Sequence, residues 1–100
     1  MTSKTISTTV QGYKFKSGNS SLTITATGKV TGNGDFSNSA VYASSSHANE
    51  TVVNLGIITS GNFIRGVNLR DGGTVINGSA TSSISGSDVG VLITGKAGTI

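Results

Sequence analysis

Residues 51–61 read TVVNLGIITSG, and residues 74–86 repeat this phrase with changes as TVINGSATSSISG. A looser version, LTITATGKVTG, stands upstream at residues 22–32. Each copy is followed by a second short phrase: AVYA at 40–43, GVNL at 66–69 and GVLI at 90–93. Self-similarity at a fixed period of about 20 to 50 residues is the signature of repeat architectures, so these phrases indicate a repeat protein.

The repeat divides the chain into units of residues 22–50, 51–73 and 74–98. Residues 1–21 form a degenerate N-terminal coil or cap, and residues 99–100 start the next coil. Each unit holds short runs rich in Val, Ile and Thr that are closed by Gly or Asn, which is typical of strands and leaves no room for a helix. The sequence therefore predicts an all-β fold, a parallel β-helix or β-solenoid of about three to four coils, whose strands stack about 4.8 Å apart.

Alignment of the units places apolar residues in four columns, which we expect to form the core. The columns are Ile24, Val52, Val75 and Ile100; Val30, Ile58 and Ile84; Val41, Val67 and Val91; and Ala43, Leu69 and Ile93. Alternation by two also turns Ala26, Asn54 and Asn77 inward at the end of the first strand. Stacked asparagines hydrogen-bond along such a stack, so Asn54 and Asn77 are expected to form an asparagine ladder.

The phrase T-V-x-N-x-G-x-I-x-G, followed by G-V-x-L and a Gly-rich turn, resembles the passenger repeats of bacterial autotransporter proteins, including adhesin-like and haemagglutinin-like surface proteins. Residues 51–61 carry it nearly complete, residues 74–86 carry it with a two-residue insertion, and residues 22–32 lack the asparagine. In that family the passenger is a single-stranded, right-handed parallel β-helix, carried by a C-terminal β-barrel. The resemblance implies a structural or adhesive segment of an exported protein at the outer-membrane surface, with host-surface or cell–cell contacts as partners.

Composition argues against an enzyme. Ser, Thr, Asn and Gly make up just over half of the chain, and charged residues make up 11%, against about 25% in an ordinary globular domain. Cys is absent and His47 is the only histidine, so we expect no catalytic residue, no cofactor and no metal site. The seven Lys and Arg residues are scattered rather than clustered, which excludes the basic stripe of a nucleic-acid-binding protein. A disordered linker is a further alternative, which the many Val and Ile residues disfavour.

A carbohydrate-binding or carbohydrate-active β-helix is the main functional alternative. Such enzymes need two positioned carboxylates, or a carboxylate with a basic side chain, on one face. Glu50 and Asp71 precede the first strand of the following unit by one and three residues, and Arg70 adjoins Asp71, so the three are expected at one corner. The simpler interpretation is a solvated corner salt bridge worth at most about 1 kcal/mol.

Two weaker signals concern metal ions. Residues 32–36, with the sequence GNGDF, faintly resemble the calcium-binding nonapeptide pattern, but Asp35 does not recur at a nine-residue interval. His47 lies in the polar stretch 44–49 without a repeated partner, so we interpret it as a loop residue.

A flat β-solenoid can also present regular rows of threonine to ice. The repeat alignment sets Thr25 on Val53 and Ile76, which interrupts one row. The file that persists in every unit consists of Thr23, Thr51, Thr74 and Thr99. The outward Val53 and Ile76, with Ile57 nearby, instead indicate a small apolar patch that contacts another protein.

The chain ends carry their own expectations. No apolar run reaches the about 18 residues of a membrane span, and residues 1–12 lack the apolar core of a signal peptide. Ile100 stops at the second residue of a coil, so we expect a fragment of a longer chain. Its uncovered end is expected to pair with neighbouring coils or to self-associate, because an open strand edge is a template for further pairing.

Overall fold

The computed structural model describes residues 2–15, 19–36, 38–44, 50–95 and 98–100. These residues form thirteen β-strands and one turn of 3-10 helix, with no α-helix among them. The strands assemble into three sheets, in which every pair of neighbouring strands runs parallel. The part of the chain that the structure describes is therefore all-β, with three parallel sheets.

The three sheets are named here A, B and C. The strands of sheet A lie in the order β1 (Thr2–Ile6), β4 (Asn19–Ile24), β7 (Glu50–Asn54), β10 (Gly73–Asn77) and β13 (Gly98–Thr99). The strands of sheet B lie in the order β11 (Ser83–Ser85), β8 (Ile57–Thr59), β5 (Lys29–Thr31) and β2 (Thr9–Gln11). The strands of sheet C lie in the order β12 (Val89–Ile93), β9 (Arg65–Leu69), β6 (Ser39–Ala43) and β3 (Tyr13–Lys14). The 3-10 turn η1 (Gly34–Phe36) lies between β5 and β6.

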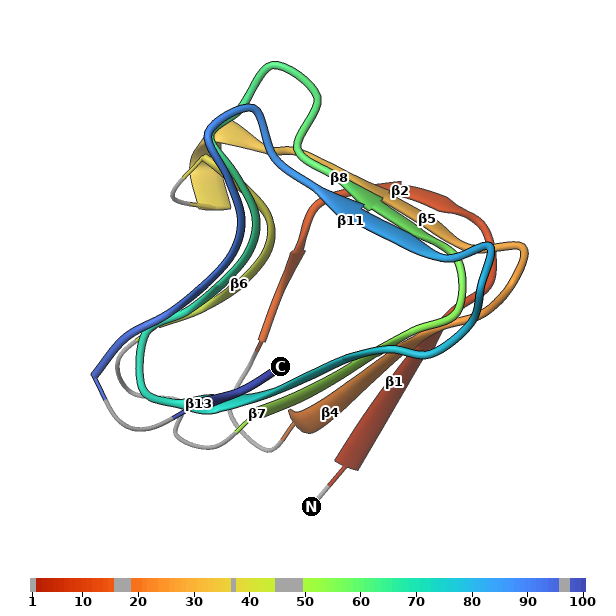
Figure 1. Ribbon diagram of the computed structural model, residues 1–100, viewed down its shortest axis with the longest axis horizontal. Coiled ribbons are helices and arrows are strands. Elements are labelled where there is room, and N and C mark those ends of the chain that lie inside the picture. Colours follow the sequence, from red (N-terminus) through yellow and green to blue (C-terminus); the bar gives the residue numbers. More distant parts are fainter. Residues whose placement is uncertain (1, 16–18, 37, 45–49, 96–97) are drawn as a thin grey trace.

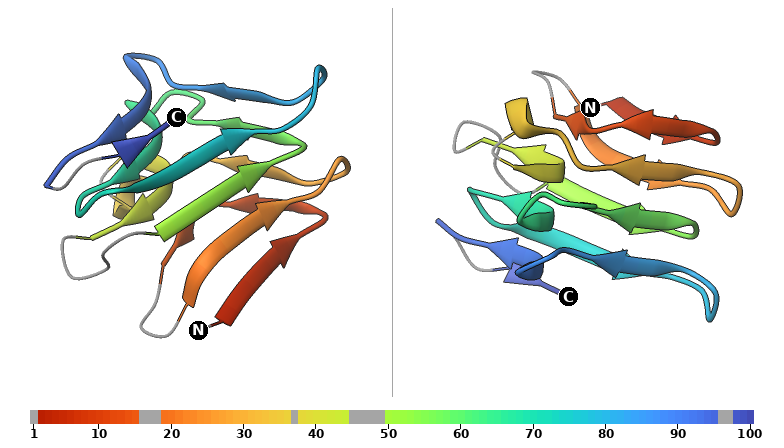
Figure 2. Two further views of the ribbon diagram at one scale, coloured as in Figure 1. Left: turned by 60° about the horizontal axis from the view of Figure 1, so that its bottom comes forward. Right: turned by 90° about the horizontal axis from the view of Figure 1, so that it is seen from above.

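The chain visits sheets A, B and C in the same order again and again (Figure 1). We call one such pass a coil, so that coil 1 contains β1–β3, coil 2 β4–β6, coil 3 β7–β9 and coil 4 β10–β12, and β13 returns to sheet A. Figure 2 shows the coils stacked in sequence order. Within residues 1–21, expected to form a degenerate coil or cap, residues 2–15 contribute one strand to each sheet, and residues 19–21 already belong to β4 of coil 2.

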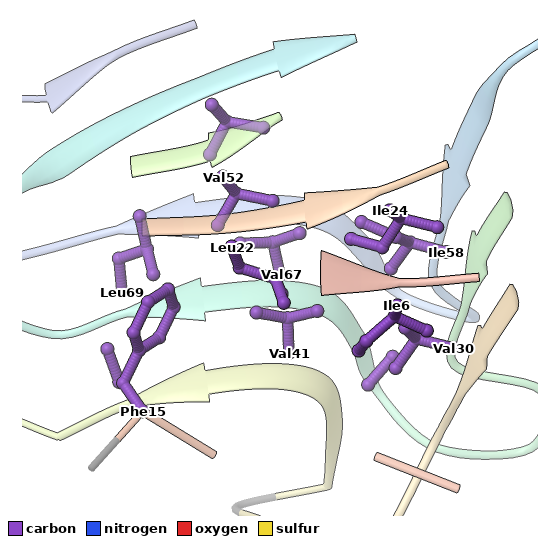
Figure 3. Close-up of a cluster of buried hydrophobic side chains, with 13 residues drawn as sticks. Ile6, Phe15, Leu22, Ile24, Val30, Val41, Val52, Ile58, Val67 and Leu69 are labelled. Atoms are coloured by element: carbon purple, nitrogen blue, oxygen red, sulfur yellow. The ribbon is translucent and has the colours of Figure 1, made fainter. Parts of the chain in front are cut away.

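Inward-facing apolar side chains fill the space between the three sheets (Figure 3). The register stacks them in columns, as the repeat alignment predicts for three of the four. The columns are Val10, Val30, Ile58 and Ile84 in sheet B; Tyr13, Val41, Val67 and Val91 in sheet C; and Ala43, Leu69 and Ile93, also in sheet C. Complete burial of such a side chain contributes about 1.5–3 kcal/mol, so these columns hold the sheets together.

The first column differs from the prediction. Leu22, rather than Ile24, is the register partner of Val52, and Ile24 pairs with Asn54. The column therefore contains Leu22, Val52 and Val75. Ile24 is still fully buried, because a shift by two residues keeps a side chain on the same face of its strand.

The length of one corner explains this difference. Two residues, Leu55 and Gly56, connect β7 to β8, whereas the four residues 25–28 connect β4 to β5. The amide of Gly28 donates to the carbonyl of Thr25 (2.9 Å), so these residues form a turn rather than an extension of the strand. Ala26, predicted to face inward, is consequently exposed on this turn.

The predicted core position of Ile100 is also wrong. Pairing between β10 and β13 ends at Thr99, and Ile100 is 83% exposed. Among the described residues no further coil lies on this end of the stack, so the side chain has nothing to pack against. The same lack of cover leaves Ile84, Val91 and Ile93 partly rather than fully buried.

Candidate functional site

The asparagine ladder is formed by the ends of β7 and β10. Asn54 and Asn77 are register partners, and Nδ2 of Asn54 donates to Oδ1 of Asn77 (3.0 Å). The same Nδ2 group donates to the carbonyl of Ser83 (2.8 Å), and Oδ1 of Asn54 accepts from the amide of Gly56 (3.2 Å). Asn54 is fully buried and Asn77 is exposed. These bonds tie the strand end to the corner and to sheet B, which is a structural rather than a chemical role.

The corner between sheets C and A gathers the predicted charged group. β9 ends at Leu69, β10 begins at Gly73, and Gly73 is the register partner of Glu50, so Arg70 and Asp71 lie in the turn next to Glu50. Arg70 is exposed and Asp71 is half-buried, but Glu50 is only 3% exposed. A glycan bound at the surface would therefore not reach the Glu50 carboxylate directly.

The remaining predicted polar residues are far less organised. Asp35 lies in η1, where its amide donates to Oδ1 of Asn33 (2.9 Å) in a local turn. The described residues hold no group of three or more His, Cys, Asp and Glu side chains placed to bind a metal ion. His47 lies outside the residues that the structure describes.

The most regular surface of the molecule is the outward side of sheet A, which we call the A face. It carries two files of short side chains, because alternate residues of each strand point away from the buried columns. The first file consists of Ser3, Ser21, Thr51, Thr74 and Thr99. The second file consists of Thr5, Thr23, Val53 and Ile76. Figure 2 (left) shows β1, β4, β7 and β10 of this sheet side by side.

The two files differ from the threonine file that the repeat predicts. Thr23, which was expected beside Thr51, is the register partner of Thr5 and Val53. Ser21 takes the expected place of Thr23 beside Thr51. The repeat does not predict the places of Ser3, Thr5 and Ser21 in these files, although the S/T-x-S/T spacing on both β1 and β4 is a signal for them.

The predicted apolar patch lies at the edge of the A face. Ile76 is 46% exposed and Ile57 is 40% exposed, whereas their neighbour Val53 is half-buried. Leu55 and Ile76 both approach Gly78, since a Cβ atom at this glycine would lie 2.8 Å from Cδ2 of Leu55 and 3.8 Å from Cγ2 of Ile76. The apolar side chains thus gather where sheet A turns into sheet B, on coils 3 and 4.

The hydroxyl groups on sheet B and at its corner with sheet A make hydrogen bonds within the protein. Oγ of Ser85 donates to Oγ1 of Thr59 (3.2 Å), and Oγ1 of Thr31 donates to the carbonyl of Val10 (3.4 Å). Thr27, at the corner between sheets A and B, donates to the carbonyl of Ser7 (2.9 Å). These hydroxyls are already used to connect one coil to the next.

The described residues contain no helix with the length and apolar character needed to cross a membrane.

Comparisons with other proteins do not assign the chain to a family. No protein-family model, no curated protein and no solved structure matches the sequence.

Proposed function

We propose that the chain is a segment of a right-handed parallel β-helix that serves as a stalk or adhesive surface in an exported bacterial protein, as in an autotransporter passenger. The observation that carries the proposal is the uninterrupted register of the buried columns through successive coils. Connections between parallel strands of one sheet are right-handed in about 98% of cases, which supports this hand. A fold of this kind grows in length by adding coils, and each coil contacts only its neighbours.

The outer surface supports the same role. The A face presents small neutral side chains over all the strands of sheet A. The three aspartates lie between strands instead: Asp35 lies in η1, Asp71 precedes β10 and Asp88 precedes β12. Glu50 is buried, which weakens the carbohydrate-binding alternative because its carboxylate was one of the three groups assigned to glycan contact.

Deletion of one whole coil tests the fold on which the proposal depends. Thr51 and Thr74 are register partners, so removal of residues 51–73 joins Glu50 to Thr74 and leaves a chain of three full coils in register. We expect this variant to keep its β-type circular dichroism and a cooperative unfolding transition, because about three coils suffice for independent stability.

The matched control removes one more residue, 51–74. A one-residue slip turns every inward side chain of the strand outward, so this variant should lose cooperative unfolding. Equal damage in the two variants would contradict a coil-by-coil architecture.

Localisation tests the functional part of the proposal. Antibodies against the 100-residue chain should label intact cells of the source organism, and external protease should remove the label. Labelling only after lysis would overturn the assignment to an exported surface protein. Adhesion of beads coated with the chain to host cells or to sister cells would then separate an adhesive surface from a passive stalk.

A further inference from the structure

The A face combines three properties that occur together on no other described surface of the molecule. Its side chains form a two-dimensional array, they are short or branched at Cβ, and the hydroxyls of Thr23, Thr51 and Thr74 make no hydrogen bond among the described residues.

The array has two fixed repeats. Across the strands, neighbouring members of a file lie one strand apart, about 4.7–4.9 Å. Along a strand, the two files lie two residues apart, about 6.6–6.8 Å. The parallel register holds from β1 to β10 in both files, and to β13 in the first. The spacing is therefore set by backbone hydrogen bonds rather than by side-chain packing.

The side chains add little freedom to this array. Thr, Val and Ile are branched at Cβ and have restricted χ1 angles, and Ser is short. On the central strand β7, both outward members, Thr51 and Val53, are half-buried between their neighbours. The hydroxyl and methyl groups are therefore held at nearly fixed positions before any ligand arrives.

The hydroxyls of the A face are available to solvent. Within the described residues, the side chains of Thr23, Thr51 and Thr74 make no hydrogen bond, in contrast to Thr27, Thr31 and Thr59 elsewhere on the surface. Groups of this kind bind water, and a layer of water that bridges fixed polar groups is nearly as favourable in enthalpy as direct hydrogen bonds.

The chemistry of the face argues against one class of partner, the nucleic acids. The side chains of the two files include no charged and no aromatic residue. Lys4, between Ser3 and Thr5, is the register partner of the buried Leu22 and so belongs to the opposite side of the sheet. Phosphate backbones require cations, and stacked bases require aromatic rings, so this surface does not suit a nucleic acid.

We propose that the A face binds ice. The hydroxyls hold water at the two repeats of the array, the methyl groups of Thr, Val and Ile keep that water ordered between them, and the ordered layer joins the crystal surface. Ice is the occupant that needs a rigid, neutral, periodic array of hydroxyl and methyl groups. The inference depends on the register of sheet A and on the unbonded hydroxyls of its outward threonines, and it goes beyond the proposed stalk or adhesive role.

Capture by ice tests the proposal directly. The folded chain, fluorescently labelled, is exposed to a slowly growing ice hemisphere, and the fraction taken into the ice is measured beside a non-binding protein. We expect enrichment of the wild-type chain in the ice. Thr51→Lys places a long charged side chain at the centre of the array and should abolish the enrichment, and Thr23→Lys should do the same from the second file.

Thr59→Lys is the matched control. Thr59 belongs to the same coil as Thr51, is also half-buried and faces outward, but lies on sheet B. This variant should be captured like the wild type once circular dichroism shows that it is folded.

Three outcomes would overturn the proposal. They are exclusion of the wild-type chain from ice, equal loss in Thr51→Lys and Thr59→Lys when both are folded, and concentration-dependent dimerisation that Val53→Lys abolishes. The last result would make the A face an interface with a second copy of the chain. Cell-surface labelling would be unaffected by any of them, so failure of this inference is distinguishable from failure of the proposed function.

Discussion

At the residue scale, Asn54 shows how a polar side chain is accommodated inside the stack. Its position is filled by Ile24 in coil 2 and by Asn77 in coil 4. The amide group satisfies the Gly56 amide, the Ser83 carbonyl and Asn77 at once. A buried amide costs little when its hydrogen bonds are made, but each partner left unsatisfied in the interior costs about 1–3 kcal/mol.

Replacement of the two ladder residues should therefore have unequal effects. Asn54→Ala leaves buried partners without a hydrogen bond, and we expect it to lower the free energy of unfolding by about 1–3 kcal/mol. Asn77→Ala removes an exposed member of the same pair and should cost about 0.5–1.5 kcal/mol or less. Urea denaturation of both variants measures the difference, and equal losses would contradict a ladder anchored at Asn54.

Leu69 and Ile93 allow a second comparison within one column. Leu69 is fully buried in coil 3, whereas its register partner Ile93 is partly buried in coil 4. Leu69→Ala should cost about 2–5 kcal/mol, because it removes buried methyl groups and leaves a cavity. Ile93→Ala should cost less. A larger loss for Ile93→Ala, by urea denaturation, would mean that the end of the stack is covered in solution.

At the element scale, the strands keep a common register although the corners between sheets A and B vary in length. Two residues form this corner in coils 1 and 3, at 7–8 and 55–56, and four form it in coil 2, at 25–28. Coil 4 uses residues 78–82, whose turn is closed by hydrogen bonds between Ser79 and Ser82. Corners on the surface absorb such changes, because their extra backbone groups bond locally or to water.

Gly56 is a corner position where side-chain size matters. A Cβ atom there would collide with the carbonyl oxygens of Thr25 and Gly28 in the coil below, and both are backbone atoms that cannot move freely. We expect Gly56→Ala to lower stability by about 1–3 kcal/mol, as overpacking does.

Gly34 provides the control for this prediction. In η1, a Cβ atom would lie 3.4 Å from the ring of Phe63 and 3.7 Å from Oδ1 of Asn38, which are ordinary contacts. Gly34→Ala should therefore leave the unfolding midpoint close to that of the wild type. If the two substitutions shifted the midpoint equally, the tight approach of coils at Gly56 would be refuted.

At the scale of the whole molecule, the last coil has no described neighbour. β11, β12 and β13 are the edge strands at this end of the stack. Three of the core columns end on β11 and β12, in the partly buried side chains of Ile84, Val91 and Ile93. An open edge offers unpaired backbone groups to another strand, and contacts between the two different ends of identical chains can continue into filaments.

We therefore expect the 100-residue chain to associate as its concentration rises, measured by light scattering after size-exclusion chromatography. Val91→Lys should suppress this association, because an inward-pointing charge on an edge strand disfavours pairing. Val53 lies on the A face in the central strand β7, away from the edge strands, so Val53→Lys serves as the control. A chain that stays monomeric at all concentrations and melts at a concentration-independent temperature would contradict the expectation.

The sequence predicts some features of the candidate sites and not others. The spacing predicts that Asn54 and Asn77 stack, because each is the fourth residue of its repeat unit and no insertion precedes it within the unit. It does not predict that Glu50 is buried, since burial at a corner depends on neighbouring coils. Nor does it predict the file that joins Ser21 to Thr51, because the alignment had placed Thr23 there.

The sequence by itself determined the period, the all-β parallel character and the inward face that the apolar residues of the repeated strands share. Those features follow from the two-residue alternation and from Val, Ile and Gly at recurring places, which local chemistry dictates. Only the tertiary structure decided which inward residues stack. A shift by two preserves the face, so the pattern allows either Leu22 or Ile24 beneath Val52. The choice is made when the four-residue corner at 25–28 closes and backbone pairing between β4 and β7 sets the register.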